Sequence, residues 1–236
     1  METRFSIIIP VLHEAAAING LLEHLRTLAL AEECEFIVVD GGPEGDTLRA
    51  IAAGKTICMA SPPGRGRQMN AGAARAVGDI LLFLHADTHP PADILIQMGR
   101  AMHDPSCLGG AFSLEIGSRK RIFRLIAALA TLRCRLTRIP YGDQAIFIRR
   151  EAFQRLGGYP EIPIMEDVAF MRRIKKSGGK ITILPQCVVT SPRRWEEEGP
   201  IYATLRNWLL LMAYNLGLPP EKLVKYYRNG GSPHVH

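Results

Sequence analysis

The chain has 236 residues, of which 47% are hydrophobic and 22% are charged, with 29 Lys and Arg against 23 Asp and Glu. This composition excludes a disordered chain, a collagen and a disulfide scaffold, and the length fits one generous domain with a buried core. The net charge of +6 fits an anionic partner without choosing among nucleotides, nucleic acids and phospholipids.

Short runs rich in Ile and Val alternate with segments of helical period over residues 1–90, a pattern typical of a parallel sheet with crossover helices. The predicted strands are 5–9, 36–39, 56–59 and 80–84, and the predicted helices between them are 15–30, 43–53 and 66–77. This arrangement indicates a nucleotide-binding half.

The remaining chain mixes the two patterns. It predicts helices at 92–103, 119–136 and 168–176, strands at 110–116, 145–148 and 180–184, further helices at 202–216 and 220–227, and a flexible tail at 229–236. We therefore expect one domain over 1–200, with its nucleotide-binding half at 1–90 and a second half at 91–200, followed by a helical extension at 201–228.

Polar residues follow three predicted strands, at the edge where open α/β sheets bind ligands. Glu14, Asp40 and Asp87 would repel one another there unless a cation or hydrogen-bond donors compensate them. Asp40 precedes Gly41 and Gly42, so it is either a turn residue or an acceptor for a base or ribose hydrogen bond. A P-loop and a dinucleotide fingerprint are both absent after the first strand.

The segment Leu81 to Thr88 carries the sharpest local signal. Alternation along an extended strand would place His85 and Asp87 on one face, where both can bind Mn²⁺ and the carboxylate suits Mg²⁺. A satisfied histidine beside a helix-capping aspartate is the alternative. Arg65 and Arg67, set among glycines before a helix, either bind phosphate or belong to a solvated loop.

Several motifs together resemble the family-2 glycosyltransferases of GT-A fold, over nearly the whole chain. The matching segments are Ser6 to Pro10 with Glu14, Val38 to Gly41, Asn70 to Gly72, His85 to Asp87, Tyr141 to Gln144, Leu156 to Pro160 and Met165 to Asp167. The nearest likeness is to small bacterial transferases associated with radical-SAM or selenodomain proteins and linked by name to arsenosugar biosynthesis. The resemblance implies an α/β fold with a mostly parallel central sheet flanked by helices, in which 91–200 would be the acceptor half, and a short C-terminal helical extension.

The resemblance also implies an inverting transferase that moves one sugar from a nucleotide sugar, expected to be UDP-linked, to a small-molecule or lipid acceptor. Asp167 would be the general base, supported by Glu166, and Asp87 with His85 would hold a divalent cation, Mn²⁺ or Mg²⁺. Alone, the Glu-Asp pair would indicate only carboxylates at a helix N-terminus. The expected donor contacts are Pro10, Val11, His13, Glu14, Asp40, Gly41, Arg65, Arg67, Asn70, His85, Ala86 and Asp87. The expected acceptor contacts are Tyr141, Gly142, Asp143, Gln144 and Trp195.

The chain departs from the family pattern at three places. His13 replaces the usual Asn, Pro43 to Asp46 replaces Ser-X-Asp-Gly, and His85 replaces the first Asp of Asp-X-Asp. With one carboxylate fewer, we expect weaker cation binding and a preference for Mn²⁺ over Mg²⁺, which isothermal titration with nucleotide present would test.

Other functions stay open at this point. The altered metal motif is compatible with a non-catalytic nucleotide-sugar sensor or scaffold, and a sugar-phosphate nucleotidyltransferase is a weaker alternative. Nucleic-acid binding would rest on charge alone, and we expect none. The C-terminal helices could contact a membrane peripherally, pack on the core or form a homodimer. Five scattered cysteines and no visible export signal favour a cytoplasmic protein, at most peripheral on the inner membrane face.

Overall fold

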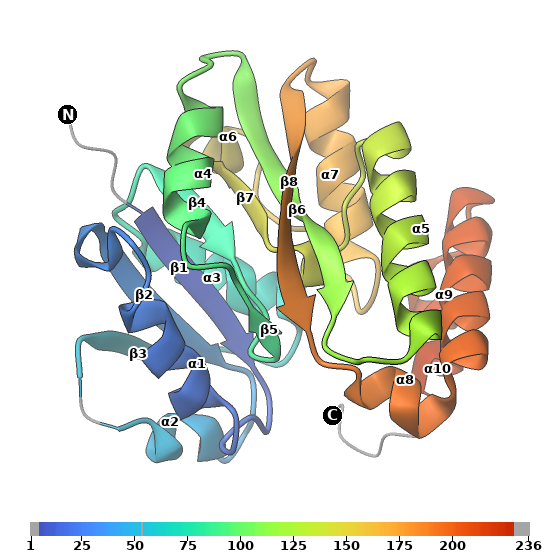
Figure 1. Ribbon diagram of the computed structural model, residues 1–236, viewed down its shortest axis with the longest axis horizontal. Coiled ribbons are helices and arrows are strands. Elements are labelled where there is room, and N and C mark those ends of the chain that lie inside the picture. The colour runs from blue at the N-terminus through green and yellow to red at the C-terminus, as the bar shows by residue number, and fades with distance from the viewer. Residues whose placement is uncertain (1–4, 53, 229–236) are drawn as a thin grey trace.

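Apolar runs of Ile, Val, Leu and Phe form the centre of one eight-stranded sheet (Figure 1). The structure is a computed structural model that describes residues 5–52 and 54–228. β1 (Phe5–Val11) and β4 (Ile80–Phe83) are buried along their whole length, and β2 (Cys34–Asp40) is buried from Phe36 onward. Strands between two helical layers need apolar side chains on both faces, which explains these unbroken runs.

Two strands of this sheet, β7 and β5, run against the direction of the other six. Its order is β3-β2-β1-β4-β7-β6-β8-β5, with parallel ladders from β3 to β4 and between β6 and β8. β7 pairs antiparallel with both of its neighbours, and β5 pairs antiparallel with β8. The predicted α/β class with a mostly parallel sheet is confirmed. The remaining strands are β3 (Thr56–Ala60), β5 (Thr88–His89), β6 (Cys107–Ile116), β7 (Ile146–Arg149) and β8 (Lys180–Thr190).

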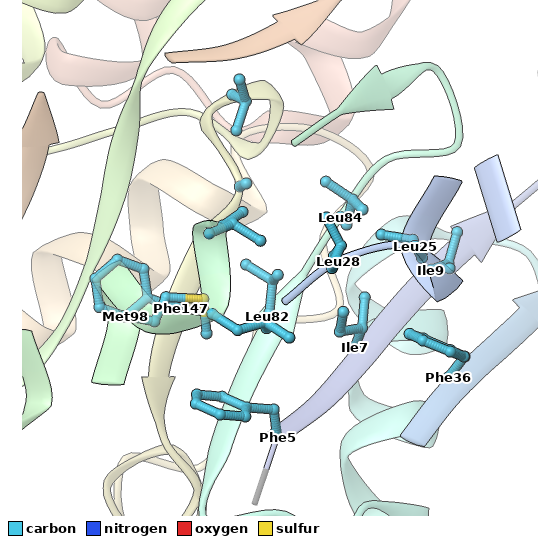
Figure 2. Packing of buried hydrophobic residues seen from close by; sticks show 14 of the residues in the cluster. Phe5, Ile7, Ile9, Leu25, Leu28, Phe36, Leu82, Leu84, Met98 and Phe147 are labelled. Carbon is cyan, nitrogen blue, oxygen red and sulfur yellow. The ribbon is translucent and has the colours of Figure 1, made fainter. Parts of the chain in front are cut away.

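Helices cover both faces of the sheet. On one face α1 and α4 bury Leu25 and Met98 in a cluster with Ile7, Ile9 and Leu82 (Figure 2). On the other face α3, α6 and α7 pack against the alternate residues of the same strands. The helices are α1 (Ile18–Arg26), α2 (Asp46–Ala50), α3 (Arg65–Arg75), α4 (Ile94–Met102), α5 (Arg121–Thr137), α6 (Arg150–Arg155), α7 (Glu166–Lys176), α8 (Arg193–Glu198), α9 (Pro200–Asn215) and α10 (Pro220–Arg228).

Some predicted boundaries were wrong. The helix predicted at 15–30 is α1 followed by a 3-10 turn at Ala31–Glu33, and the helix predicted at 43–53 is only α2, which follows Gly45 at φ 61°. The strand predicted at 180–184 continues to Thr190 past a register shift. The helices α6 and α8 and the strand β5 were missed, because so few residues show no readable period. The tail predicted at 229–236 lies outside the described residues.

The C-terminal helices pack on the domain core. Leu210 of α9 and Leu223 of α10 join a cluster with Ile164, Met165 and Val168, at the start of α7. This packing brings the helical extension next to the sheet edge where polar residues gather. None of the described helices is both long and apolar enough to span a bilayer.

Candidate active site

Gln68 of α3 joins the carboxyl ends of β1 and β2. Its Nε2 donates to the carbonyl oxygens of Val11 at 2.7 Å and Val39 at 2.9 Å. A Cβ on Gly41 would lie 2.9 Å from this side chain, so glycine is needed for the close packing. Pro10 and Val11 lie within β1, and Val11 contributes its carbonyl to this junction. No motif signalled Gln68 in the sequence, because its role depends on the packing of α3.

Asp40 is fully buried at the end of β2. Its Oδ1 accepts a hydrogen bond from the Gly42 amide at 2.7 Å, while its Oδ2 finds no donor within the described residues. A buried carboxylate oxygen that lacks a hydrogen-bond donor lowers the stability of the fold. This oxygen is therefore suited to accept a hydrogen bond from a ligand that approaches Gly41 and Gly42.

The loop after β1 is fixed by polar contacts to α2 and α8. His13, at φ 56°, donates from Nδ1 to Asp46 Oδ2 at 3.1 Å, and this hydrogen bond lowers the pKa of Asp46. The Glu14 carboxylate pairs with Arg193 at 3.1 Å. The charge of Glu14 is thus compensated by a guanidinium.

His85, Ala86 and Asp87 lie in a turn, because β4 ends at Phe83 and the Thr88 amide bonds to the His85 carbonyl at 3.1 Å. The prediction that strand alternation aligns His85 with Asp87 was therefore wrong. Burial, followed by the nearby Arg65, lowers the pKa of His85, while Asp87 and Asp167 oppose that shift. Neutral imidazole is the form that can bind a metal.

Gly142 joins the turn after β4 to the start of α7. The Gly142 amide donates to Asp167 Oδ2 at 2.8 Å, and the Val168 amide donates to Asp167 Oδ1 at 2.7 Å. A Cβ on Gly142 would lie 2.8 Å from His85 Nε2 and 3.7 Å from Asp167 Oδ2. His85 and Asp167 therefore flank this glycine from two sides.

Asp143 is a third acidic side chain in the region of Asp87 and Asp167. Burial, followed by repulsion from Asp167, raises its pKa to about 6, and Asp87 acts in the same direction. Its buried Oδ1 has no hydrogen-bond donor among the described residues. Asp143 thus lies close enough to Asp87 and Asp167 for their charges to repel its own, a repulsion that a bound cation would relieve.

Glu166 and Arg65 form an ion pair behind this cluster. Arg65 Nε lies 2.8 Å from Glu166 Oε1, and the Glu166 side chain is only 3% exposed. Burial raises the pKa of Glu166, and the Glu166 charge raises the pKa of Arg65. The pair fixes Arg65 near His85. Arg67 instead pairs with the exposed Glu161 at 3.0 Å.

Other expected site residues make contacts within the fold. The Asn70 amide holds the Tyr159 main chain with bonds of 2.9 and 2.8 Å. The buried Gln144 donates to the Phe112 carbonyl at 3.0 Å and accepts from the Tyr141 amide at 3.2 Å. These bonds position the turn that carries Gly142 and Asp143.

The two aromatic residues expected at the acceptor site are both packed against neighbours. The Arg133 guanidinium lies 3.6 Å from the centre of the Tyr141 ring. Trp195 packs edge-on against Phe123 of α5, with ring centres 6.5 Å apart. One face of Tyr141 is therefore already covered by protein.

Arg194 and Tyr227 were missed as site residues. Arg194 donates to the Tyr227 hydroxyl, and its charge lowers the pKa values of both His85 and Asp143. The segment Ser191 to Trp195 could have indicated Arg194 through its resemblance to an Arg-Trp element of processive synthases. Tyr227 carries no local signal, because only the return of α10 brings it to the site.

The architecture is that of the GT-A glycosyltransferases. The mannosyltransferase PcManGT from Pyrobaculum calidifontis, solved in complex with GDP-Man and Mn²⁺, superposes with a TM-score of 0.68 at 21% identity, covering 94% of this chain and 67% of its own. Residues 1–349 of S. aureus TarS superpose with a TM-score of 0.61 at 17% identity, covering 94% and 69% of the two chains.

Residues 6–161 match Glycosyl transferase family 2, and the chain belongs to this family. Glucosyl-3-phosphoglycerate synthase from Mycobacterium tuberculosis is 31% identical over 100 residues, which cover 39% of this chain and 31% of the synthase. The Mycolicibacterium smegmatis synthase is 27% identical over the same length, with 39% and 33% covered. The match thus spans about a third of the relatives' own length.

Proposed function

We propose that the chain transfers one sugar from a nucleotide sugar to an acceptor hydroxyl, with inversion at the anomeric carbon. The observation that carries this proposal is the placement of Asp167 at Gly142, beside His85 and close enough to Asp143 that burial and the Asp167 charge together raise the Asp143 pKa. Membership in glycosyltransferase family 2 supports the class of reaction. A sensor or a nucleotidyltransferase gains no support from any contact in this site.

The donor nucleotide would bind at the ends of β1 and β2. Asp40 Oδ2 is buried without a donor from the described residues, and it suits the ring N–H of a base or a ribose hydroxyl. Uracil and guanine both carry such a ring N–H. We keep UDP as the expected nucleotide, although PcManGT was solved with GDP-Man.

A divalent cation fits the residues present. Asp87 and His85 would hold it. In the same region, the buried Oδ1 of Asp143 has no hydrogen-bond donor among the described residues, and burial and neighbouring carboxylates raise the pKa of Asp143. The described residues hold no group of three or more ligating side chains, so the donor diphosphate would complete the ligand set, as is usual for Mg²⁺ sites. When bound, the cation would neutralise charge on the departing diphosphate.

Asp167 would act as the general base. Two main-chain amides orient its carboxylate, and the neighbouring Glu166 is held by Arg65. As the acceptor oxygen bonds to the anomeric carbon, the bond from that carbon to the diphosphate oxygen breaks and the hydroxyl proton passes to Asp167. One displacement with one base inverts the configuration.

The acceptor would approach from the side of the 141–144 turn. We propose a small-molecule or lipid-borne hydroxyl compound and, on the motif resemblance, a place among the bacterial transferases associated with radical-SAM proteins. Arg194 and Tyr227 border this side. They are candidates for contacts with the acceptor that sequence motifs did not include.

A thermal-shift screen of UDP-, GDP-, dTDP- and CDP-sugars, each with Mn²⁺, with Mg²⁺ and with EDTA, tests donor binding. A ligand present at 100 times its Kd raises the free energy of unfolding by about 2.7 kcal/mol. For a chain of this size, this corresponds to a rise in melting temperature of roughly 5–10 °C. At least one donor should give this shift with metal, and Asp40→Asn should abolish it. Asp79→Asn, at the opposite end of the sheet, is the matched control. A shift that survives Asp40→Asn would remove Asp40 from the donor site.

A further inference from the structure

The outer surfaces of α5 and α9 carry an unusual amount of exposed apolar area. Of the fifteen large hydrophobic side chains exposed in the described part of the chain, twelve lie within 125–136 and 201–218. On α5 they are Leu125, Leu129, Leu132 and Leu136, which are 45–76% exposed and follow helical spacing.

The α9 helix carries a matching stripe. Leu205, Trp208, Leu209 and Met212 of α9 and Leu216, directly after it, are 49–80% exposed. Their helical spacing places them on one side of the helix. The two helices contact each other at one edge of the molecule (Figure 1). We call these five side chains, together with the four on α5, the α5–α9 face.

This face is not needed to hold the helices in place. α5 already buries Phe123, Ile126 and Ala127, and α9 already buries Leu210 in the cluster at the start of α7. A helix packed on a core needs one apolar stripe, so a second exposed one is left for another partner. Exposed apolar areas of this extent usually mark a binding surface.

The α5 side of the face is strongly basic, although Lys120 pairs with Glu196 of α8 at 3.4 Å. Residues 119–138 include seven Lys and Arg and no Asp or Glu. Arg121 and Arg124 are exposed, and no carboxylate of the described chain lies within ion-pair distance of either. Two copies joined through this face around a twofold axis would oppose these charges, which disfavours a dimer. An anionic bilayer instead offers hydrocarbon and negative headgroups together.

We propose that the α5–α9 face binds the surface of a membrane rich in anionic phospholipid, independently of the proposed transfer reaction. The apolar stripes would lie in the interface, with Arg121 and Arg124 at the headgroups. Arg133 of α5 also covers Tyr141, and α9 packs behind the start of α7. Binding in this way would hold the 141–144 side of the candidate site close to the bilayer.

Co-sedimentation of the full chain with vesicles tests this surface. We expect binding to phosphatidylcholine vesicles that contain phosphatidylglycerol and much weaker binding to phosphatidylcholine alone. Replacing Leu129 and Leu209 with Ser should weaken binding about tenfold or more, because each loses burial of a large side chain. Val77→Ser, an exposed apolar position outside the face, should change little.

Charge-reversal variants distinguish binding through the α5–α9 face from binding that depends only on the net positive charge of the protein. Arg121→Glu with Arg124→Glu should weaken binding about tenfold or more, whereas Arg75→Glu with Arg155→Glu, the same change in net charge on α3 and α6, should have a small effect. An unchanged melting temperature checks that each variant folds. Equal loss in both pairs, equal binding to neutral vesicles, no binding at all, or a dimer that the Leu variants dissociate would each overturn the proposal.

Discussion

Gly142 is the residue at which the two halves of the candidate site meet. Its amide bonds to Asp167, and its Cα faces His85 so closely that no side chain fits between them. Glycine is therefore needed here so that His85 and Asp167 can both lie close to the chain. Its backbone conformation does not require glycine, because its φ is not positive. The site depends on this spacing as much as on its charged residues.

Replacing Gly142 with Ala should displace either His85 or the 141–144 turn, because the new Cβ would lie 2.8 Å from His85 Nε2. We expect donor turnover to fall about tenfold or more, with a loss of roughly 1–3 kcal/mol in unfolding free energy. Turnover assays and denaturant unfolding measure both. Gly20→Ala, in α1 with nothing within 4 Å of the new Cβ, is the control. Normal turnover of Gly142→Ala would show that the spacing is not critical.

The Asp143 carboxyl should make stability fall as pH rises. Its pKa is raised to about 6, so the folded protein holds this proton more tightly than the unfolded chain, where Asp titrates near 3.9. The loss of stability should develop between about pH 4 and pH 6 and persist above it. Asp143→Asn should therefore stabilise the metal-free protein by on the order of 1–2 kcal/mol at pH 7.5 and by little at pH 4.

Urea unfolding in EDTA at the two pH values measures this difference. Asp104→Asn is a control of opposite sign, because hydrogen bonds from Lys180 and Ser106 lower the pKa of Asp104 to about 2. That variant should lose stability at pH 7.5, and the loss should shrink as pH falls toward 2. Equal stabilisation by Asp143→Asn at both pH values would contradict the raised pKa.

At the scale of elements, the insertion of the antiparallel strand β7 between β4 and β6 depends on close strand contacts. Gly109 and Gly110 of β6 lie between β7 and β8, and a Cβ on Gly110 would lie 2.0 Å from the Thr182 carbonyl oxygen. There is thus no room for a side chain at Gly110, near the start of β6. The contacts that join the two halves of the sheet pass through these glycines.

Gly110→Ala should destabilise the fold by about 2 kcal/mol or more, since backbone cannot move aside as a side-chain end can. Gly99→Ala, in the middle of α4 with only an ordinary contact at 3.8 Å, should instead stabilise by about 0.5–1 kcal/mol. Thermal and urea unfolding compare the two variants. Similar stability of both would show that β6 can shift away from β8.

The elements that sequence could predict are those with a long, readable period. The buried strands β1 and β2 and the amphipathic α5 follow from their residue patterns, whereas α6 and α8 are too short for one. The prediction that His85 and Asp87 share one face of a strand failed, because β4 ends at Phe83 and the chain then turns. Their role as metal ligands stays a prediction. Motifs singled out Asp40 and Asp167 as candidate site residues, whereas Gln68 and Tyr227 make tertiary contacts that no local pattern contains.

At the scale of the whole molecule, a buried ion pair helps to hold the C-terminal helices. Arg206 of α9 lies 2.7 Å from Glu198 at the end of α8, with side chains 7% and 8% exposed. Arg206 also lies 5.3 Å from the Tyr227 ring, which links it to the residue beside Arg194. The pair thus connects α8, α9 and α10 next to the candidate site.

Arg206→Leu should destabilise the protein by about 3–5 kcal/mol, because Glu198 would stay buried without its partner. The double variant Arg206→Leu with Glu198→Leu should recover much of this loss, since neither charge is then buried alone. Urea unfolding of the wild type, both single variants and the double variant gives the four free energies of unfolding of a double-mutant cycle. Additive losses would mean that the two side chains do not compensate each other.

Release of nucleoside diphosphate by the wild type and by Asp167→Asn, with Mn²⁺ and the donor found in the thermal-shift screen, measures the proposed reaction most directly. Asp167→Asn should bind the donor as tightly as the wild type and release the diphosphate about 10²- to 10⁴-fold more slowly. Equal rates of release from the two proteins would contradict the role of Asp167 as the base.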